Sequence, residues 1–457
     1  MSDWDVIVLG AGQTGSPLAT RLAEAGRRVL LAERKHVGGT CVNYGCTPTK
    51  TMIASARAAH VARTAGALGI CVEAVTVDLA AVVQRKDAKV LQWRQSVERR
   101  LARAGAALRL VPGHARFVGE RAIEVNGEAH RADVVVINVG TRPAVPPIAG
   151  LGDVPWLDNT RVMELRAVPE HLLVLGGGFI GCEFGQAFRR FGARVTIIDQ
   201  AAHLLAVEDT AVSEAVEDVF RTEGITLHLG ARVRSVRRAG ANIELQLEGG
   251  DRLTGSHLLV AVGRTPNTDD LACELAGVEL DERGYIRVDD GYATSARGVY
   301  ATGDVTGGPQ FTHVAWDDHR LLYDIIQGRE PRGRATRLIP RATFTDPQVA
   351  AVGLTERQAQ EQGVHYEVVT YPFGHIARAI ETEETAGLVK ILIDPGSERI
   401  LGATIVGAEA AELIHIVVAA MAARASAKVL VDAEFVHPAY AEGVQSALLR
   451  LARYAPA

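Results

Sequence analysis

The sequence has little of what marks secreted, membrane or nucleic-acid-binding proteins. It contains only 5 cysteines in 457 residues, too few for a disulfide scaffold. No uninterrupted apolar run reaches transmembrane length. The formal net charge of -5 lacks the basic excess of a nucleic-acid-binding domain. The first residues lead directly into a strand pattern, without a basic and then apolar signal peptide, so we expect a cytoplasmic protein that binds neither membrane nor nucleic acid.

The length of the chain predicts several domains. A chain of 457 residues is too long for one core and should divide into about three domains. Prolines and glycines gather at 143–152, where we expect a boundary. Cys71, Cys182 and Cys273 are scattered, and we predict that each is an inert packing thiol.

The segment 38–50 holds the other two cysteines, Cys41 and Cys46, separated by four residues and followed by helix signals. A thiol at the start of a helix has a lowered pKa, because the helix N-terminus is positive. A close pair of thiols can cycle between dithiol and disulfide by exchange with a substrate. By itself the spacing also suits half of a metal site or two unrelated buried thiols. No second cysteine pair completes a tetrahedral metal site, so we predict no metal ligands.

A nucleotide fingerprint lies just upstream of this pair. A continuous apolar strand at 5–9 precedes the glycine-rich segment 10–15, a helix at 17–25 and a strand at 28–32. The second strand ends in Glu33, a carboxylate that can bind ribose hydroxyls, while the glycines let the backbone approach a pyrophosphate at the helix N-terminus. The glycines of this fingerprint are Gly10, Gly12 and Gly15.

A second fingerprint follows further along the chain. An apolar strand at 172–175 precedes the segment 176–183, a helix to about residue 191 and a strand at 194–198. The strand ends in Asp199, which favours NADH because a carboxylate repels the 2'-phosphate of NADPH. The glycines of this fingerprint are Gly176, Gly178 and Gly181.

The remaining segments predict further strands and a different C-terminal region. Charged amphipathic helices are expected at 51–67 and 79–104. The strand-like segment 298–304 ends in Asp304, which can bond a cofactor hydroxyl or cap the following helix. From about residue 336 strands are followed by helices, which is typical of an α+β domain, with a final helix at 443–453.

The chain contains, in this order, a dinucleotide unit, a cysteine pair, a second dinucleotide unit and a terminal His437-Pro438 with Glu442. In this the chain resembles the class I pyridine nucleotide-disulfide oxidoreductases, which include dihydrolipoyl dehydrogenase, glutathione reductase and mercuric reductase. The resemblance implies an α/β fold of two Rossmann-like dinucleotide-binding domains, for FAD and NAD(P), plus a C-terminal α+β dimerisation domain. The implied domains are 1–148 and 268–335 for FAD, 149–267 for NAD(P) and 336–457 for the dimer interface.

The resemblance also implies how the cofactors bind. FAD would place its pyrophosphate on the first fingerprint, its ribose at Glu33 and its ribitol at Asp304, and NADH (with NADPH possible) would bind the second fingerprint. The implied cofactor-binding residues are Gly10, Gly12, Gly15, Glu33, Gly39, Thr40, Gly140, Thr141, Gly176, Gly178, Gly181, Asp199, Gly263, Arg264, Gly303 and Asp304.

The same resemblance assigns catalytic roles. Cys46 would lie against the flavin, and Cys41, more exposed, would attack the substrate. Lys50 would stabilise negative charge on the reduced flavin and pair with Glu183. His437 would be the general acid–base, oriented by Glu442 and preceding a cis peptide bond to Pro438, in the active site of the other subunit of a homodimer.

Some features depart from particular members of this family. The printed sequence shows neither the N-terminal metal-binding domain nor the C-terminal vicinal cysteines of mercuric reductase, so we expect inefficient Hg(II) reduction. Tyr44 and Tyr440 are bulky, and we predict packing roles for both.

We therefore predict an FAD-dependent NAD(P)H:disulfide oxidoreductase acting on a small disulfide. The alternatives are a metal-ion reductase for Hg(II) or Cu(II) using the same pair, and an oxidant-responsive binding protein without turnover.

Overall fold

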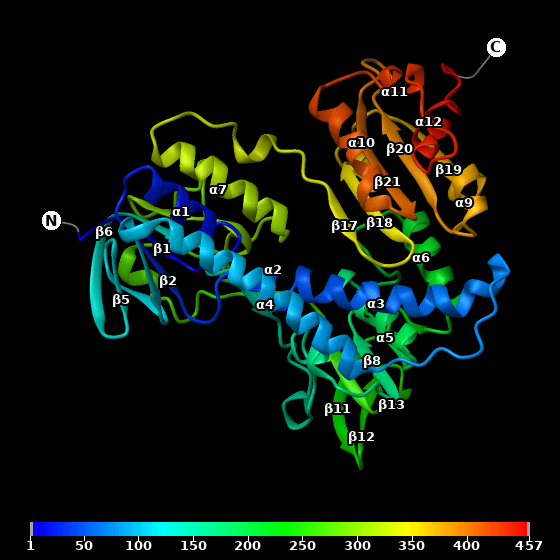
Figure 1. The fold of residues 1–457 in the computed structure, drawn as a ribbon, viewed down its shortest axis with the longest axis horizontal. Coiled ribbons are helices and arrows are strands. Elements are labelled where there is room, and N and C mark those ends of the chain that lie inside the picture. The colour runs from blue at the N-terminus through cyan, green and yellow to red at the C-terminus, as the bar shows by residue number, and fades with distance from the viewer. Residues whose placement is uncertain (1–2, 455–457) are drawn as a thin grey trace. The chain divides into compact units, whose positions relative to one another are not determined.

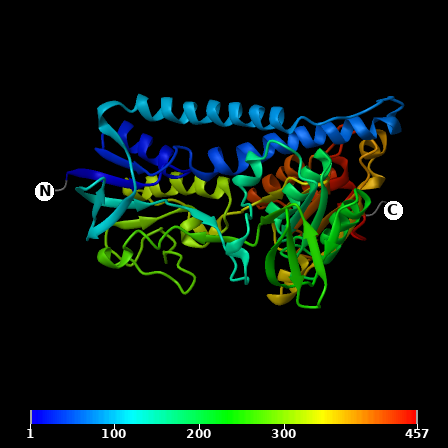
Figure 2. The same ribbon diagram turned by 90° about the horizontal axis from the view of Figure 1, so that it is seen from below.

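The computed structural model describes residues 3–454, which divide into two compact units. Unit 1 contains the residues up to Thr51, together with Val83–Ala144 and Gly263–Arg337. Unit 2 contains Met52–Val82, Val145–Val262 and the residues from Leu338 onward. The divisions at Thr51 and Val83 fall inside two helices, α3 and α4, which are the long blue and light-blue helices of Figure 2.

Unit 1 is built on a seven-stranded sheet (Figure 1). Strands β3, β2, β1, β6 and β16 run parallel in that order, while β5 and β4 continue the sheet from β6 in antiparallel fashion. A separate two-stranded ribbon joins β7 to β15. The strands are β1 (Trp4–Leu9), β2 (Val29–Glu33), β3 (Leu108–Pro112), β4 (Ala115–Gly119), β5 (Ala122–Val125), β6 (Glu128–Ile137), β7 (Thr141–Pro143), β15 (Arg264–Pro266) and β16 (Val299–Ala301).

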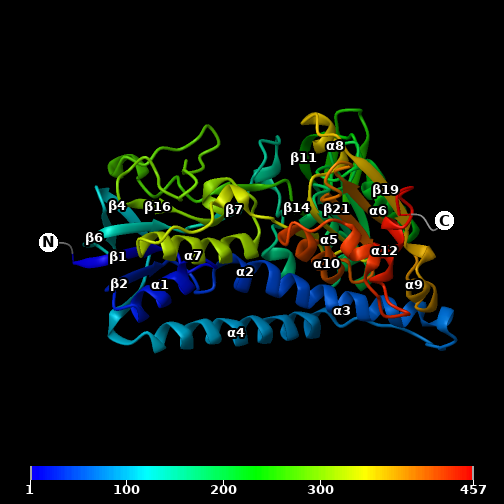
Figure 3. The ribbon, with the colours of Figure 1, turned by 90° about the horizontal axis from the view of Figure 1, so that it is seen from above.

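Both faces of strand β1 are buried, as its uninterrupted apolar sequence predicts for a parallel sheet. Ile7 and Leu9 join the core on one face, while Val6 and Val8 join the core on the other. The second core also receives side chains from α1 and α7, which lie side by side in Figure 3. The helices that carry residues of this unit are α1 (Gly15–Glu24), α2 (Gly39–Tyr44), α3 (Cys46–Thr64), α4 (Leu79–Arg103) and α7 (Thr312–Ile326).

Unit 2 begins with a second parallel sheet, in the order β10-β9-β8-β14. An antiparallel sheet, β11-β12-β13, follows in the chain and was not predicted from the sequence. These elements are β8 (His171–Leu175), α5 (Phe179–Phe191), β9 (Arg194–Ile198), α6 (Thr210–Thr222), β10 (Thr226–His228), β11 (Val233–Ala239), β12 (Asn242–Leu247), β13 (Arg252–Gly255) and β14 (His257–Val260).

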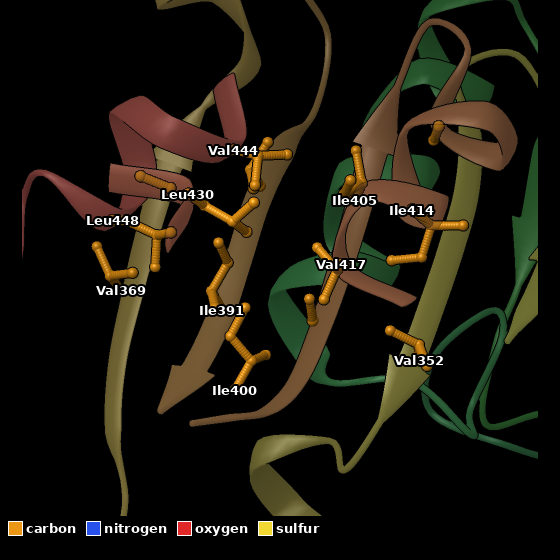
Figure 4. Packing of buried hydrophobic residues seen from close by; sticks show 14 of the residues in the cluster. Val352, Val369, Ile391, Ile400, Ile405, Ile414, Val417, Leu430, Val444 and Leu448 are labelled. Carbon is orange, nitrogen blue, oxygen red and sulfur yellow. The ribbon is translucent and has the colours of Figure 1, made fainter. Parts of the chain in front are cut away.

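The C-terminal part of unit 2 is a five-stranded antiparallel sheet with helices packed on it, in the order β17-β18-β21-β20-β19. Figure 4 shows its core, in which Val352 and Ile391 of the sheet lie with Val417 of α10 and Val444 of α12. The elements are β17 (Arg341–Thr343), β18 (Gln348–Gly353), α8 (Glu356–Glu361), β19 (Glu367–Pro372), α9 (Ala377–Glu381), β20 (Leu388–Ile393), β21 (Ile400–Gly407), α10 (Ala410–Ala422), α11 (Lys428–Asp432) and α12 (Glu442–Leu448).

The structure confirms the predicted fold class, because unit 1 and the first part of unit 2 are each Rossmann-like and the C-terminal part of unit 2 is α+β. It corrects some details. Cys71 is exposed, so it is not a packing thiol, whereas Cys182 and Cys273 are buried as predicted. Cys71 lies outside any helix or strand, in the segment between a short 3-10 helix, Ala65–Leu68, and α4. Helix α12 ends at Leu448, earlier than expected. Within residues 3–454, no helix combines the length and apolar character needed to cross a bilayer.

Candidate active site

The cysteine pair lies where two helices of unit 1 meet. Cys41 lies within α2, and Cys46 is the first residue of α3. Gly45 joins the helices, and a Cβ there would lie 3.0 Å from the carbonyl oxygen of Thr40. A hydrogen bond joins the two cysteine side chains, and Cys46 Sγ lies 3.0 Å from Thr312 Oγ1 at the start of α7. The two sulfurs are therefore close enough to exchange with each other.

The relative exposure of the two cysteines is the reverse of our expectation. Cys46 is the exposed residue and Cys41 is half-buried. Cys41 lies inside α2 and is hydrogen-bonded to Cys46, whereas Cys46 is the first residue of α3. The hydrogen bond to Cys46, followed by burial, raises the pKa of Cys41 well above its usual range, while the Thr312 hydroxyl and the Lys50 charge oppose the shift. In this arrangement Cys41 holds its proton.

The glycine loops of the two dinucleotide units have the same geometry. Gly10 and Gly176 have φ of +99° and +112°, in the left-handed region that favours glycine. A Cβ on Gly15 or Gly181 would lie 1.9 Å from the carbonyl oxygen of the first glycine of its loop. Each loop therefore packs backbone against backbone where α1 or α5 begins, which is the cradle that a dinucleotide pyrophosphate requires.

Each acidic residue at a strand end also holds its glycine loop. Glu33 Oε2 accepts a hydrogen bond of 2.8 Å from the amide of Ala11, and Asp199 Oδ2 accepts one from the amide of Gly177. The second oxygen of each carboxylate accepts the amide two residues further on, at 2.8 Å in Glu33 and 2.7 Å in Asp199. The two carboxylates are thus placed beside the loops that would carry FAD and NAD(P)H, and their bonds to ribose stay predictions.

Sequence reasoning missed Asn138, the residue that fixes the first loop from the opposite side. Its Oδ1 accepts the amide of Gly15 at 3.0 Å, and its Nδ2 donates to the carbonyl of Thr302 at 3.1 Å. The available signal was a polar residue directly after the apolar residues 134–137 that end β6.

Replacing Asn138 by alanine is expected to destabilise the protein by about 1–3 kcal/mol and to lower its flavin content, because the Gly15 amide loses its buried acceptor. Thermal unfolding and the flavin absorbance per chain measure the two effects. Asn242→Ala, at the exposed start of β12, is the control. Unchanged flavin content and melting temperature in Asn138→Ala would contradict this role.

Asp304 lies inside the 3-10 helix Gly303–Thr306 and is not at its N-cap, so the capping alternative is wrong. Thr141 Oγ1 donates to Asp304 Oδ2 at 3.2 Å, and Arg264 Nε donates to the same Thr141 hydroxyl at 2.7 Å. Burial raises the pKa of Asp304 above its usual range, although the Arg264 charge and the Thr141 hydrogen bond oppose this. Three predicted cofactor residues are therefore joined in one chain of hydrogen bonds.

The other predicted cofactor residues of unit 1 lie on short connections. Gly39 is the first residue of α2, where a Cβ would lie 2.8 Å from the Cα of Gly12, and Thr40 follows it. Gly140 follows β6, and Gly263 precedes β15. These positions bring Gly39 against the first fingerprint, and direct contacts of the others with a cofactor stay predictions.

The predicted acid–base pair lies in the C-terminal part of unit 2. His437 Nδ1 lies 3.0 Å from Glu442 Oε1, and Glu442 Oε2 accepts the amide of Ala439 at 2.8 Å. The Ala439 amide and then His437 lower the pKa of Glu442, so it is ionised at neutral pH. The His437 side chain is 69% exposed, and the peptide bond to Pro438 is cis, as predicted.

Lys50 and Glu183 belong to different compact units. Glu183 is buried in α5, and its Oε1 accepts the amide of Phe344 at 2.9 Å. Lys50 lies in the second turn of α3 and contributes positive charge to the cysteine pair. Their pairing stays a prediction. Within the part of the chain that the structure describes, no cluster of three or more His, Cys, Asp or Glu side chains could hold a metal ion.

Comparison with protein families gives two matches that together span most of the chain. Residues 4–318 match the model described as pyridine nucleotide-disulphide oxidoreductase. Residues 339–448 match the model described as the dimerisation domain of the same family.

Individual relatives cover nearly the whole chain. The chain is 34% identical over 453 residues to the probable pyridine nucleotide-disulfide oxidoreductase RclA of Escherichia coli, covering 97% of this chain and 98% of the relative. It is 34% identical to a dihydrolipoyl dehydrogenase of Thermus scotoductus, covering 98% and 97%. It is 33% identical to a mercuric reductase of Staphylococcus aureus, covering 98% of this chain and 82% of the relative.

Solved structures show the same similarity. A Cu(II) complex of a mutant of RclA, described as an HOCl-induced flavoprotein disulfide reductase from Escherichia coli, matches with a TM-score of 0.91 at 33% identity. That match covers 99% of this chain and 100% of the other. LpdA from Mycobacterium tuberculosis matches with a TM-score of 0.89 at 28% identity, covering 98% and 99%.

Proposed function

Because the chain belongs to the pyridine nucleotide-disulphide oxidoreductase family, we propose that Cys41 and Cys46 carry electrons from NADH to a small disulfide substrate. The chain is a flavoprotein oxidoreductase of the NAD(P)H-dependent, disulfide-reducing kind. The observation that carries the proposal is the contact between the two cysteine side chains at the start of α3. FAD, when bound, accepts two electrons from the reduced nicotinamide and delivers them to the cysteine disulfide.

The residues of the first unit suit FAD. The loop at Gly10–Gly15 leaves no room for a side chain at Gly10 or at Gly15, where α1 begins, and Glu33 binds the amide of Ala11 in this loop. Asp304 and Thr141 would hold the ribitol, and Lys50 would stabilise negative charge near the thiols. The second loop and Asp199 would bind the nicotinamide nucleotide.

The proposed thiol chemistry balances over two exchange steps. His437 of the partner subunit takes the proton of the Cys41 thiol, and the resulting thiolate attacks one sulfur of the substrate disulfide, which forms a mixed disulfide and releases the first substrate thiolate. Protonated His437 of the partner subunit gives that thiolate its proton. The Cys46 thiolate then attacks Cys41 Sγ, which releases the second substrate thiolate and leaves a Cys41–Cys46 disulfide. That second thiolate takes a proton from water, and two electrons and one proton from NADH return the disulfide to a Cys41 thiol and a Cys46 thiolate.

A homodimer is part of the proposal. Residues 339–448 carry the family's dimerisation domain, and His437 and Glu442 lie within them. The exposed imidazole of His437, already paired with Glu442, suits a group that serves a second subunit. Glu442 would orient the ring through Nδ1 and so leave Nε2 to face the substrate sulfur.

A steady-state panel tests the proposed function. The purified holoenzyme is assayed with NADH and with NADPH against lipoamide, low-molecular-weight disulfides, Hg(II) and Cu(II). We expect turnover with at least one disulfide and a higher kcat/KM for NADH than for NADPH. Turnover confined to metal ions would favour the metal-ion reductase, as the similarity to mercuric reductases and to a protein solved with Cu(II) suggests. Flavin reduction without turnover of any acceptor, quinones included, would favour a redox-responsive binding protein.

Asp199→Asn is expected to raise kcat/KM for NADPH by about 10-fold. It should lower kcat/KM for NADH by a smaller factor than that. The amide keeps an oxygen for Gly177 but loses the acceptor of the Ala201 amide and the charge that repels a 2'-phosphate. Glu214→Gln, an exposed acid on α6, is the control. An unchanged ratio of the two constants in Asp199→Asn would remove Asp199 from nucleotide selection.

A further inference from the structure

Tyr440 lies between His437 and Glu442 in the sequence, and its side chain is held both by its ring and by its hydroxyl. The ring stacks on the buried ring of Phe373, with centroids 5.6 Å apart and an interplanar angle of 24°. The hydroxyl donates to Glu384 Oε2 and lies 2.8 Å from Thr382 Oγ1. The expected packing role therefore covers only the ring, because a ring that merely packs does not need these polar partners.

The acceptor of the Tyr440 hydroxyl is itself held in place. Glu384 Oε1 accepts a hydrogen bond from the Arg57 guanidinium, whose other terminal nitrogen donates to Asp346 Oδ1 at 3.0 Å. Asp346 also accepts a hydrogen bond of 2.7 Å from Arg190, a buried residue of α5. An arginine bridging two carboxylates fixes their orientation better than a single surface ion pair does. Tyr440 is therefore attached to a network of side chains and not to a loosely held surface carboxylate.

The other end of the same turn is held by Glu442. One of its oxygens accepts the Ala439 amide at 2.8 Å and the other lies 3.0 Å from His437 Nδ1. The segment from His437 to Glu442 is thus anchored at Tyr440 on one side and at Glu442 on the other. The imidazole of His437 remains largely exposed, so its direction depends on the anchored backbone.

We propose that Tyr440 is a positioning residue for His437, acting through the Tyr440–Glu384–Arg57 hydrogen bonds. This inference rests on the proposed function, in which His437 transfers the proton of the substrate thiol. In this role Tyr440 touches neither substrate nor cofactor. Its hydroxyl fixes the turn, and the fixed turn keeps the imidazole in line for proton transfer. Because proton transfer depends steeply on alignment, a small shift of the turn slows only the step that uses His437.

Tyr440→Phe removes the hydroxyl and keeps the ring on Phe373. We expect oxidation of the reduced enzyme by the disulfide substrate to slow about 10-fold, while reduction of the flavin by NADH keeps its rate. Stopped-flow absorbance measures the two half-reactions separately. Tyr366→Phe is the matched control, because its hydroxyl also donates to a glutamate of unit 2, Glu356 Oε1 at 3.0 Å, far in sequence from His437.

The decisive comparison repeats Tyr440→Phe in a His437→Ala background. If Tyr440 acts through His437, the second change slows the half-reaction with the disulfide by less than about 2-fold there. Equal slowing in both backgrounds, slowing of both half-reactions, or a wild-type rate for Tyr440→Phe alone would overturn the inference. A wild-type rate for His437→Ala alone would overturn the proposed acid–base role, which is a distinct result. The melting temperature of each variant checks that the chains are folded.

Discussion

Cys46→Ser is expected to lower disulfide turnover by at least about 10³-fold, because serine cannot form the Cys41–Cys46 disulfide or resolve the mixed disulfide. Reduction of the flavin by NADH should remain. In the reduced enzyme, the long-wavelength absorbance that arises between a thiolate and the flavin should be present in wild type and absent from Cys46→Ser. Steady-state rates and anaerobic spectra measure these effects.

Cys41→Ser is the matched variant, and Cys71→Ser is the control at an exposed thiol outside the pair. Cys41→Ser should lose turnover to the same degree but keep the long-wavelength band. The band should survive unchanged in Cys71→Ser. A band lost in Cys41→Ser and kept in Cys46→Ser would reverse the assigned roles, and the greater exposure of Cys46 makes this comparison necessary.

His437→Ala is expected to slow disulfide turnover by about 10²- to 10⁴-fold, the range typical of losing a general acid–base. Reduction of the flavin by NADH should change little, because that step transfers no proton to a substrate thiol. Rapid mixing of the oxidised enzyme with NADH, and of the reduced enzyme with the disulfide, measures the two half-reactions separately. His365→Ala, an exposed histidine of the same unit, is the control. Equal losses in both half-reactions would show that His437 supports the structure instead of the proton transfer.

Much of the fold was predictable because the signals are local. The glycines around Gly10 and Gly176 stand between an apolar strand and a helix, and the acids Glu33 and Asp199 end the next strands. These features depend on backbone geometry that only a few residue types allow. The family resemblance supplied the predicted order of the domains and the separate roles of Cys41 and Cys46.

What the sequence did not reveal depends on contacts between distant segments. Thr312 reaches Cys46 across 266 positions, and Asn138 reaches Gly15 across 123. The sequence around Thr312 and around Asn138 contains no pattern that predicts these hydrogen-bond partners. Within the sheet β11-β12-β13, the arginine-rich strand β11 shows weak alternation, whereas β12 alternates polar and apolar residues, a signal that was missed. The polar anchor of Tyr440 was missed for the same reason as Thr312, since Glu384 lies 56 positions away.

In the proposed function, NADH opens a disulfide between Cys41 and Cys46. Air-oxidised holoenzyme is alkylated under denaturing conditions before and after anaerobic addition of NADH, and the labelled peptides are identified by mass spectrometry. We expect two labels that appear only after NADH, one on Cys41 and one on Cys46. Identical labelling of this pair with and without NADH, or NADH-dependent labels confined to Cys71, Cys182 or Cys273, would contradict it.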